Sequence, residues 1–274
     1  MGLRAKNEMR GASRNTSLIM RRFDYLWRQF GTGLSFAVFG LTGVLFSVFF
    51  FPLIFVFVRK PDTRQSIVRR LVGYGFGAFI WMMKGLGIFS YKISGLENVG
   101  ARHNLLVIAN HPTLIDVVFL VALFPEVDCV VKEAVINNPF MRGVVVPARY
   151  ISSDDPGEFL DTCVARLKSG GSLLLFPEGT RSVHGQSLKF KLGAAAVAVR
   201  SGAGVLPVMI QCTQPGFLAK HQPWYKVPPE RPFITIEVQR PVPLESMIPA
   251  GLEPRQATID LNNALLGLYR KTLS

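Results

Sequence analysis

The chain has 274 residues, of which 49% are hydrophobic, and it carries a formal net charge of +13 at pH 7. Its length leaves room for one catalytic domain and a smaller segment of different composition. High apolar content together with positive charge favours an anionic lipid surface as the partner. Nucleic acid is not expected to bind, because the basic residues form no zinc-finger spacing, RNP-like aromatic strand or recognition-helix pattern.

The three cysteines, Cys129, Cys163 and Cys212, lie far apart in the sequence. They have no metal-ligand spacing, so the sequence indicates neither a disulfide framework nor a structural zinc site. A reducing compartment is the simpler interpretation of scattered, unpaired cysteines.

A long apolar segment lies in the N-terminal third of the chain. Residues 31–58 contain no charged side chain, and this length is sufficient to cross a hydrocarbon core of about 30 Å. A cleaved signal peptide is the weaker interpretation, because its apolar region would span only about 7 to 15 residues and end at a small-residue cleavage site. A second apolar stretch, residues 71–90, is interrupted only by Lys84. We expect it to be a helix at the membrane interface.

Basic residues flank the first apolar segment on both sides. They are Arg4, Lys6, Arg10, Arg14, Arg21, Arg22 and Arg28 before it, and Arg59, Lys60, Arg64, Arg69 and Arg70 after it. A single membrane crossing would place one cluster outside, against the positive-inside tendency. We therefore favour a helix pair that dips into one leaflet, kinked at Pro52, over a spanning helix. This arrangement places the protein on the inner (cytoplasmic) membrane, with its catalytic domain facing the cytoplasm.

The remainder of the chain has the pattern of an α/β domain. From about residue 104, short apolar runs alternate with helical segments, which predicts a mixed, largely parallel sheet flanked by helices. We divide the chain into an N-terminal membrane-anchoring helical region, residues 1–95, and a catalytic domain, residues 96–274. The expected strands are residues 105–109, 129–132, 172–176, 205–210 and 233–238.

Two helices of this domain have clear signals. Asp155 is placed to cap a helix that begins at Pro156, with Glu158 at the acidic position of a capping box. The last helix, near residues 255–271, carries an apolar stripe. Leu261, Leu265, Leu268 and Tyr269 form this stripe.

A histidine and an aspartate follow the first predicted strand, at the end where ligand sites of open α/β sheets cluster. His111 and Asp116 would lie about 140° apart on a helix, so they meet only if the helix is broken between them. Pro112 predicts this break, since the residue before a proline is pushed toward extended geometry. We expect Pro112 then to open the helix that carries Asp116. A carboxylate on one imidazole nitrogen leaves the other free to act as a general base, whereas a histidine that only caps or packs is the alternative.

A second polar turn, residues 176–182, follows another apolar strand. Gly179 allows the backbone to approach a ligand, Arg181 offers a planar fork suited to phosphate, and Glu178 accepts hydrogen bonds from hydroxyls. Together with Thr180, these residues are the candidate binding residues of the turn. For this segment alone, a glycine turn with a surface ion pair between Glu178 and Arg181 is the alternative.

The order of these segments resembles the glycerolipid acyltransferase family, typified by 1-acylglycerol-3-phosphate acyltransferases. The resemblance covers residues 96–242 and rests on His111 and Asp116, then residues 176–182 and 205–208. It implies that His111 deprotonates a lysolipid hydroxyl, that Asp116 orients His111, and that the hydroxyl attacks an acyl thioester directly. It implies no covalent enzyme intermediate, no metal and no cofactor other than the thioester co-substrate.

The resemblance also assigns binding roles. It implies that Glu178, Gly179 and Arg181 hold the polar head of the acceptor, and that the strand containing Pro207 helps to line the acyl site. Lys132 falls where the family has a lysine between its first two motifs.

One segment departs from the family pattern. Family members commonly end a strand with an arginine that contacts acceptor phosphate, whereas residues 149–153 read Arg-Tyr-Ile-Ser-Ser. Arg149 is a candidate replacement from a shifted position, with a solvated surface role as the alternative. The acceptor is therefore either a lysophosphatidic acid or a lipid hydroxyl without phosphate.

The expected partners are membrane lipids and an acyl thioester donor. Coenzyme A and acyl carrier protein present the same thioester and are both acidic, so both donors stay open, as does the oligomeric state. A serine hydrolase, a P-loop enzyme and a dinucleotide-dependent enzyme are not supported, because their glycine motifs do not occur. A catalytically silent lipid-binding or scaffold protein of this fold would be expected to lack His111 or Asp116, and both are present.

Overall fold

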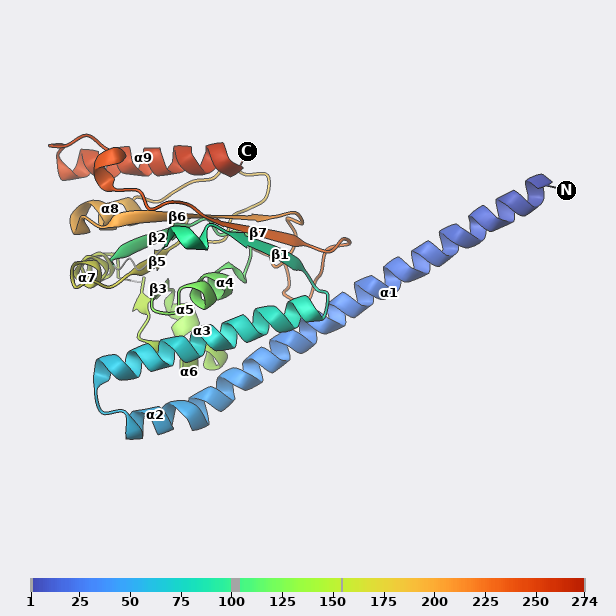
Figure 1. Ribbon diagram of the computed structural model, residues 1–274, viewed down its shortest axis with the longest axis horizontal. Coiled ribbons are helices and arrows are strands. Elements are labelled where there is room, and N and C mark those ends of the chain that lie inside the picture. The colour runs from blue at the N-terminus through green and yellow to red at the C-terminus, as the bar shows by residue number, and fades with distance from the viewer. Residues whose placement is uncertain (1, 100–103, 154, 274) are drawn as a thin grey trace.

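The computed structural model describes residues 2–99, 104–153 and 155–273. Figure 1 shows an α/β body with a central sheet, from which a long N-terminal helix projects. In the described residues the sheet has seven strands in the order β1-β7-β6-β2-β5-β3-β4, and only the β6–β7 pair is antiparallel. The strands are β1 (Ser90–Ser94), β2 (Leu105–Ala109), β3 (Asp128–Val131), β4 (Ile151–Ser152), β5 (Leu173–Leu175), β6 (Gly204–Cys212) and β7 (Phe233–Val238). The predicted fold class, a mixed and largely parallel sheet flanked by helices, is confirmed.

Helices cover both faces of this sheet (Figure 1). They are α3 (Pro61–Gly85), α4 (Asp116–Leu123), α5 (Glu133–Ile136), α6 (Pro139–Ala148), α7 (Pro156–Lys168), α8 (Gly193–Ser201) and α9 (Pro254–Leu273), with short 3-10 helices at Leu96–Asn98 and Leu244–Ser246. In β2, Leu106 and Ile108 face the core formed with α7, α8 and α9, whereas Val107 and Ala109 face the core formed with α3 and α4. Because side chains alternate between faces and both faces are covered, β2 is buried along its whole length.

All five predicted strands occur. Residues 105–109 and 233–238 have the predicted bounds, and the other three strands differ from prediction by one or two residues at their ends. The sequence analysis missed β1 and β4. Both are partly exposed edge strands whose serine-containing sequences form no apolar run.

The two helix signals are also confirmed. Oδ1 of Asp155 accepts hydrogen bonds from the backbone N–H groups of Gly157, at 2.9 Å, and Glu158, at 3.1 Å, and Pro156 opens α7. On α9, Leu261, Leu265 and Tyr269 are buried. The hydroxyl of Tyr269 donates to the carbonyl of Ile108 at 2.5 Å, which ties the last helix to the central strand three residues before His111.

The N-terminal apolar run is helical almost throughout. It comprises α1 (Gly2–Leu45), a π-helical turn (Phe46–Phe50) and α2 (Phe51–Phe57). Within the described residues, Ile19–Phe57 is the one helix long and apolar enough to cross a membrane, with a mean hydropathy of 2.3 and 6% of its apolar window buried. An exposed apolar helix of this kind supports membrane association.

We predicted that a kink at Pro52 separates two helices. In the structure the helix bends near this residue but continues to Phe57. Pro52 is the second residue of α2, near which the helix axis changes direction (Figure 1), and proline removes a donor from the helical ladder. The chain reverses later, between the end of α2 and the start of α3 at Pro61. The two basic clusters therefore lie toward opposite ends of one helix, and a helix lying along the membrane surface is needed to keep both on the same side.

Helix α3 is formed as expected, but it is part of the α/β body. Val68, Val72 and Phe76 belong to the core that covers one face of the sheet, while Tyr74 and Trp81 are 74% and 75% exposed. Strand β1 then pairs with β7 in the same sheet. The division between residues 95 and 96 stays a prediction, and the sheet extends on both sides of it.

Two arginines of the flanking basic clusters do not face a membrane. Arg28 is 0% exposed and Arg69 is 2% exposed. Arg28 donates to backbone carbonyls between β6 and β7, and Arg69 contacts the carboxylate of Asp128 in β3. These two arginines flank the apolar segment in the sequence, but the charge of each is paired within the protein.

Candidate active site

His111 and Asp116 meet at the carboxyl end of β2. Nδ1 of His111 lies 2.8 Å from Oδ2 of Asp116; the Asp116 side chain is fully buried and that of His111 is 17% exposed. An ionised carboxylate only accepts hydrogen bonds, so Nδ1 carries the proton and Nε2 keeps its free lone pair. The ring of His111 also stacks on Phe176, with 4.3 Å between ring centroids. The imidazole is thus fixed in orientation and tautomer, as a general base requires.

The turn that joins the two residues differs from our prediction. Helix α4 begins at Asp116, and residues 113–115 form a turn rather than the helix that we expected Pro112 to open. Asp116 stabilises this turn: Oδ2 accepts the backbone N–H of Thr113 at 2.6 Å, and Oδ1 accepts its hydroxyl at 2.5 Å. His111 lies outside the helix, as predicted.

The second polar turn is bonded to the first. Oε1 of Glu178 accepts the backbone N–H of His111 and the hydroxyl of Ser182, both at 2.9 Å. The backbone N–H of Ser182 donates to the carbonyl of His111 at 2.8 Å. β2 and β5 are neighbouring parallel strands, so their carboxyl ends bring these two turns together.

Gly179 and Arg181 are fixed by backbone geometry and contacts. Gly179 has a φ of +67°, a conformation that favours glycine, whereas the nearest atom to an added Cβ, Nζ of Lys191 at 3.0 Å, belongs to a flexible side chain that can move. Nη1 of Arg181 donates to the carbonyls of Leu218 and Ala219, at 3.0 and 3.1 Å. The structure describes both Glu178 and Arg181 and shows no ion pair between them. Each bonds to other groups, so the alternative of a surface ion pair is not supported.

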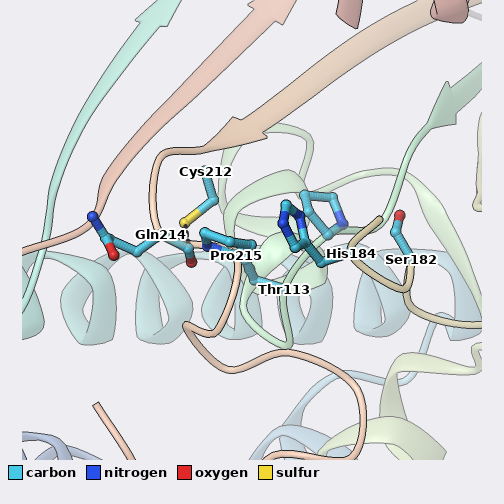
Figure 2. Close-up of a pocket in the computed structure, with 7 residues that line it drawn as sticks. Thr113, Ser182, His184, Cys212, Gln214 and Pro215 are labelled. Carbon is cyan, nitrogen blue, oxygen red and sulfur yellow. Dashed lines mark hydrogen bonds between the residues drawn. The ribbon is translucent and has the colours of Figure 1, made fainter. Parts of the chain in front are cut away.

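A small cavity of about 130 Å³ opens beside the two turns. Figure 2 shows Cys212, Gln214 and Pro215 on one side of it, His184 and Ser182 on the other, and Thr113 between them. Thr113 and Ser182 also bond directly to Asp116 and Glu178, so the cavity adjoins the His111 network. Burial raises the pKa of the Cys212 thiol to about 11, so this cysteine is a poor nucleophile here.

Comparisons with known proteins agree with this geometry. A family model described as Acyltransferase matches residues 90–211. The chain is 32% identical over 132 residues to the chloroplastic 1-acyl-sn-glycerol-3-phosphate acyltransferase of Arabidopsis thaliana, covering 46% of this chain and 37% of that protein. It is 30% identical over 138 residues to the 1-acyl-sn-glycerol-3-phosphate acyltransferase of Pseudomonas aeruginosa, covering 47% of this chain and 52% of that protein.

Residues 90–211 belong to the acyltransferase family whose model they match. The crystal structure of a 1-acyl-sn-glycerophosphate acyltransferase from Thermotoga maritima has the same fold, with a TM-score of 0.65, 23% identity and coverage of 89% of this chain and 97% of that one. The chain spans about half or less of the two curated relatives described above, 52% and 37% of their lengths.

The other predicted binding residues lie on or beside four different strands of the sheet. Thr180 is half-buried in the turn after β5, and Pro207 is buried in β6 beside Ile108 of β2. Lys132 is exposed at the carboxyl end of β3. Arg149 is exposed and precedes β4, which runs parallel to β3. It therefore lies toward the amino-terminal ends of these two strands. The structure brings Thr180 to the His111 site and does not bring Arg149 there.

Several residues of the two predicted turns were given no role of their own in the sequence analysis. Thr113, Ser182 and Phe176 contact the predicted residues directly. A hydroxyl three residues before Asp116 and another four residues after Glu178 were available signals, because short polar side chains in turns bond to nearby groups. The carbonyl of Leu218 bonds both to the N–H of Leu114 and to Arg181, and a backbone acceptor leaves no signal in the sequence.

Glu178 should make the stability of the acyltransferase domain pH-dependent. Burial raises the pKa of its carboxyl group, although the His111 N–H and the Ser182 hydroxyl partly offset this. A carboxyl group whose pKa is higher in the folded state binds protons more tightly there, so its contribution to stability improves as pH falls through the folded pKa. Glu178→Gln keeps an oxygen acceptor but never ionises. We expect thermal unfolding at pH 8 and pH 5 to show the wild type gaining stability relative to this variant on acidification.

The control is Glu178→Ala, which removes the acceptor. It should cost about 1–3 kcal/mol at both pH values, because two donors lose their partner. If wild type and Glu178→Gln change in parallel between the two pH values, the buried carboxylate has no such effect.

Proposed function

We propose that this chain is an O-acyltransferase that moves a fatty acyl group from a thioester to the hydroxyl of a lysolipid in a membrane. The observation that carries the proposal is the contact between Nδ1 of His111 and the buried carboxylate of Asp116, which leaves Nε2 as a proton acceptor. The names of the curated relatives support the same class of reaction.

The chemistry assigned to the site is a direct transfer. Nε2 of His111 accepts the proton of the acceptor hydroxyl while its oxygen attacks the thioester carbonyl carbon. The carbon–sulfur bond then breaks, and the protonated imidazole returns the proton to the departing thiolate. The products are an ester and a free thiol, and His111 ends in its starting state. Asp116 stabilises the imidazolium that forms between these steps.

Lysophosphatidic acid is the first candidate acceptor, because it is the substrate class in the names of the relatives. A second candidate is a lysolipid without phosphate. Two observations favour it. Arg149 lies toward the amino-terminal ends of β3 and β4, whereas His111 lies at the carboxyl end of β2, and Nη1 of Arg181 is engaged by two carbonyls. The proposed location is the cytoplasmic face of the inner membrane, on the support of the exposed apolar helix and its remaining basic flanks.

The proposal is tested with purified protein in phospholipid vesicles. Labelled acyl-coenzyme A and labelled acyl carrier protein are each supplied with lysophosphatidic acid, with a monoacylglycerol, or with no acceptor. We expect label in a diacyl product only when an acceptor is present, and the ratio of initial rates identifies the donor and the acceptor. Folded, vesicle-bound protein that acylates neither acceptor from either donor would overturn the proposal.

A further inference from the structure

The connection between β6 and β7, residues 213–232, links the His111 site to helix α1. It leaves the carboxyl end of β6 and runs toward α1 before returning to β7 (Figure 1). Irregular connections longer than about 12–15 residues are uncommon in compact domains and usually serve a function. Three parts of this connection have separate contacts: an inner end, an outer end and an exposed tip.

The inner end of the connection holds both active-site turns. The carbonyl of Leu218 accepts the N–H of Leu114 and Nη1 of Arg181, both at 3.0 Å, and the carbonyl of Ala219 accepts Nη1 of Arg181 at 3.1 Å. Phe217 and Leu218 are buried. A displacement of this end would therefore move the turn that carries His111 and the turn that carries Arg181 together.

The outer end is bonded to α1 through Arg28. This side chain is fully buried, and its Nη1 and Nη2 donate to the carbonyls of Pro228 and Pro229, both at 2.8 Å. Its Nε donates to Asp24 at 2.8 Å on the same helix. A guanidinium that is buried and fully engaged in this way is costly to displace, so α1 and the connection are expected to move as one body.

The tip comprises residues 220–226, of which Lys220 is half-buried and residues 221–226 are exposed. Trp224 and Tyr225 are 46% and 51% exposed, and their rings pack edge to face with centroids 5.6 Å apart. Trp224 also contacts Phe36 of α1, at 5.3 Å between centroids. Lys220 and Lys226 lie at the two ends of the tip, which has no acidic residue. Tryptophan and tyrosine beside cations have the composition of segments that bind at the headgroup level of a membrane.

We propose that the tip, residues 220–226, is a second membrane-binding element, which places Trp224 and Tyr225 among the headgroups of an anionic phospholipid bilayer. The bilayer is favoured as the partner because the tip packs against α1, the apolar helix of the chain, and because its only charges are positive. Through Leu218, the same connection fixes the active-site turns relative to the membrane surface. This inference concerns binding, and its test uses no acyl donor, so it stands or fails separately from the proposed activity.

The test uses Trp224 as its own reporter. The chain has three tryptophans, and replacing Trp27 and Trp81 by Phe leaves Trp224 as the source of fluorescence. The protein is placed in phosphatidylcholine–phosphatidylglycerol vesicles with and without brominated acyl chains, which quench tryptophan only on close approach. We expect strong quenching by the brominated lipid and a blue-shifted emission. Emission that is unquenched by brominated lipid, yet remains open to acrylamide in the water, overturns the proposal.

Charge variants test the contribution of the two lysines. In the single-tryptophan protein, Lys220→Gln and Lys226→Gln should each lower the ratio of inserted to free tip by about fivefold on anionic vesicles. Phosphatidylcholine vesicles should show little change. Lys168→Gln, at an exposed site on α7, is the matched control and should behave as the parent. Equal quenching in all variants, or a Trp224 signal that responds to acyl carrier protein and not to lipid, would reject an anionic bilayer as the partner.

Discussion

His111→Ala should lower the rate of acyl transfer by about two to four powers of ten, the usual contribution of a positioned general base. The variant loses the only group that we assign to accept the proton of the hydroxyl. The remaining parts of the site can still bind both substrates, so the loss is expected in kcat rather than in the apparent KM. Initial rates with a labelled acyl thioester and a lysolipid measure it.

The fold should tolerate this change. The His111 side chain is partly exposed, and its removal leaves Asp116 with two hydrogen bonds from Thr113. The buried carboxylate therefore keeps donors, and the variant should unfold near the wild-type temperature and still sediment with vesicles. A rate close to wild type from folded His111→Ala would contradict the assignment.

Asp116→Asn is the matched variant for the other half of the pair. The amide has the shape of the carboxylate but can donate to Nδ1, which would favour the tautomer whose Nε2 carries the proton. Because the two residues act as one unit, the double variant should be hardly slower than His111→Ala alone. Additive losses would instead mean that Asp116 acts separately from His111.

The parts of the site that could be predicted from the sequence are those set by local geometry. His111 follows an apolar strand and precedes a proline, and these two facts place it outside the helix at the carboxyl end of the strand. The turn after β5 is placed by the same reasoning, and the parallel pairing of β2 and β5 brings the two turns together. The apolar pattern also located the central strands β2 and β5, because burial on both faces produces continuous apolar runs.

The parts that could not be predicted depend on contacts between distant residues. The carbonyl of Leu218 binds Arg181 and Leu114, yet no side-chain chemistry marks that position. Arg28 and Arg69 have the same charge as their solvent-exposed neighbours, and their burial depends on carbonyls and a carboxylate supplied by residues 59 or more positions away. A basic cluster beside an apolar helix thus contains both solvent-exposed charges and charges paired inside the protein.

Asp128→Ala should destabilise the fold by about 3–5 kcal/mol, because it leaves a buried arginine without its counter-charge. Asp128 is 3% exposed and contacts Arg69, which is 2% exposed, and also Arg166. At about 2–4 °C per kcal/mol for a chain of this size, the midpoint of thermal unfolding should fall by about 6–20 °C. Arg200→Ala is the control, because the Arg200–Asp161 pair is exposed and should contribute at most about 1 kcal/mol.

Replacing both buried partners separates the cost of an unpaired charge from the value of the pair itself. Arg69→Met with Asp128→Leu removes the two charges together, and Arg166 is 38% exposed, so it can reach water. This double variant should regain much of the stability lost in Asp128→Ala, since apolar side chains often replace a buried pair at little cost. Failure to regain it would mean that the pair contributes through geometry, namely the hydrogen bond from Arg69 to the carbonyl of Ala148 and the links among α3, β3 and α7. Because Arg69 lies on α3, either outcome makes the helix after the apolar run part of the same cooperative unit as the sheet that carries His111.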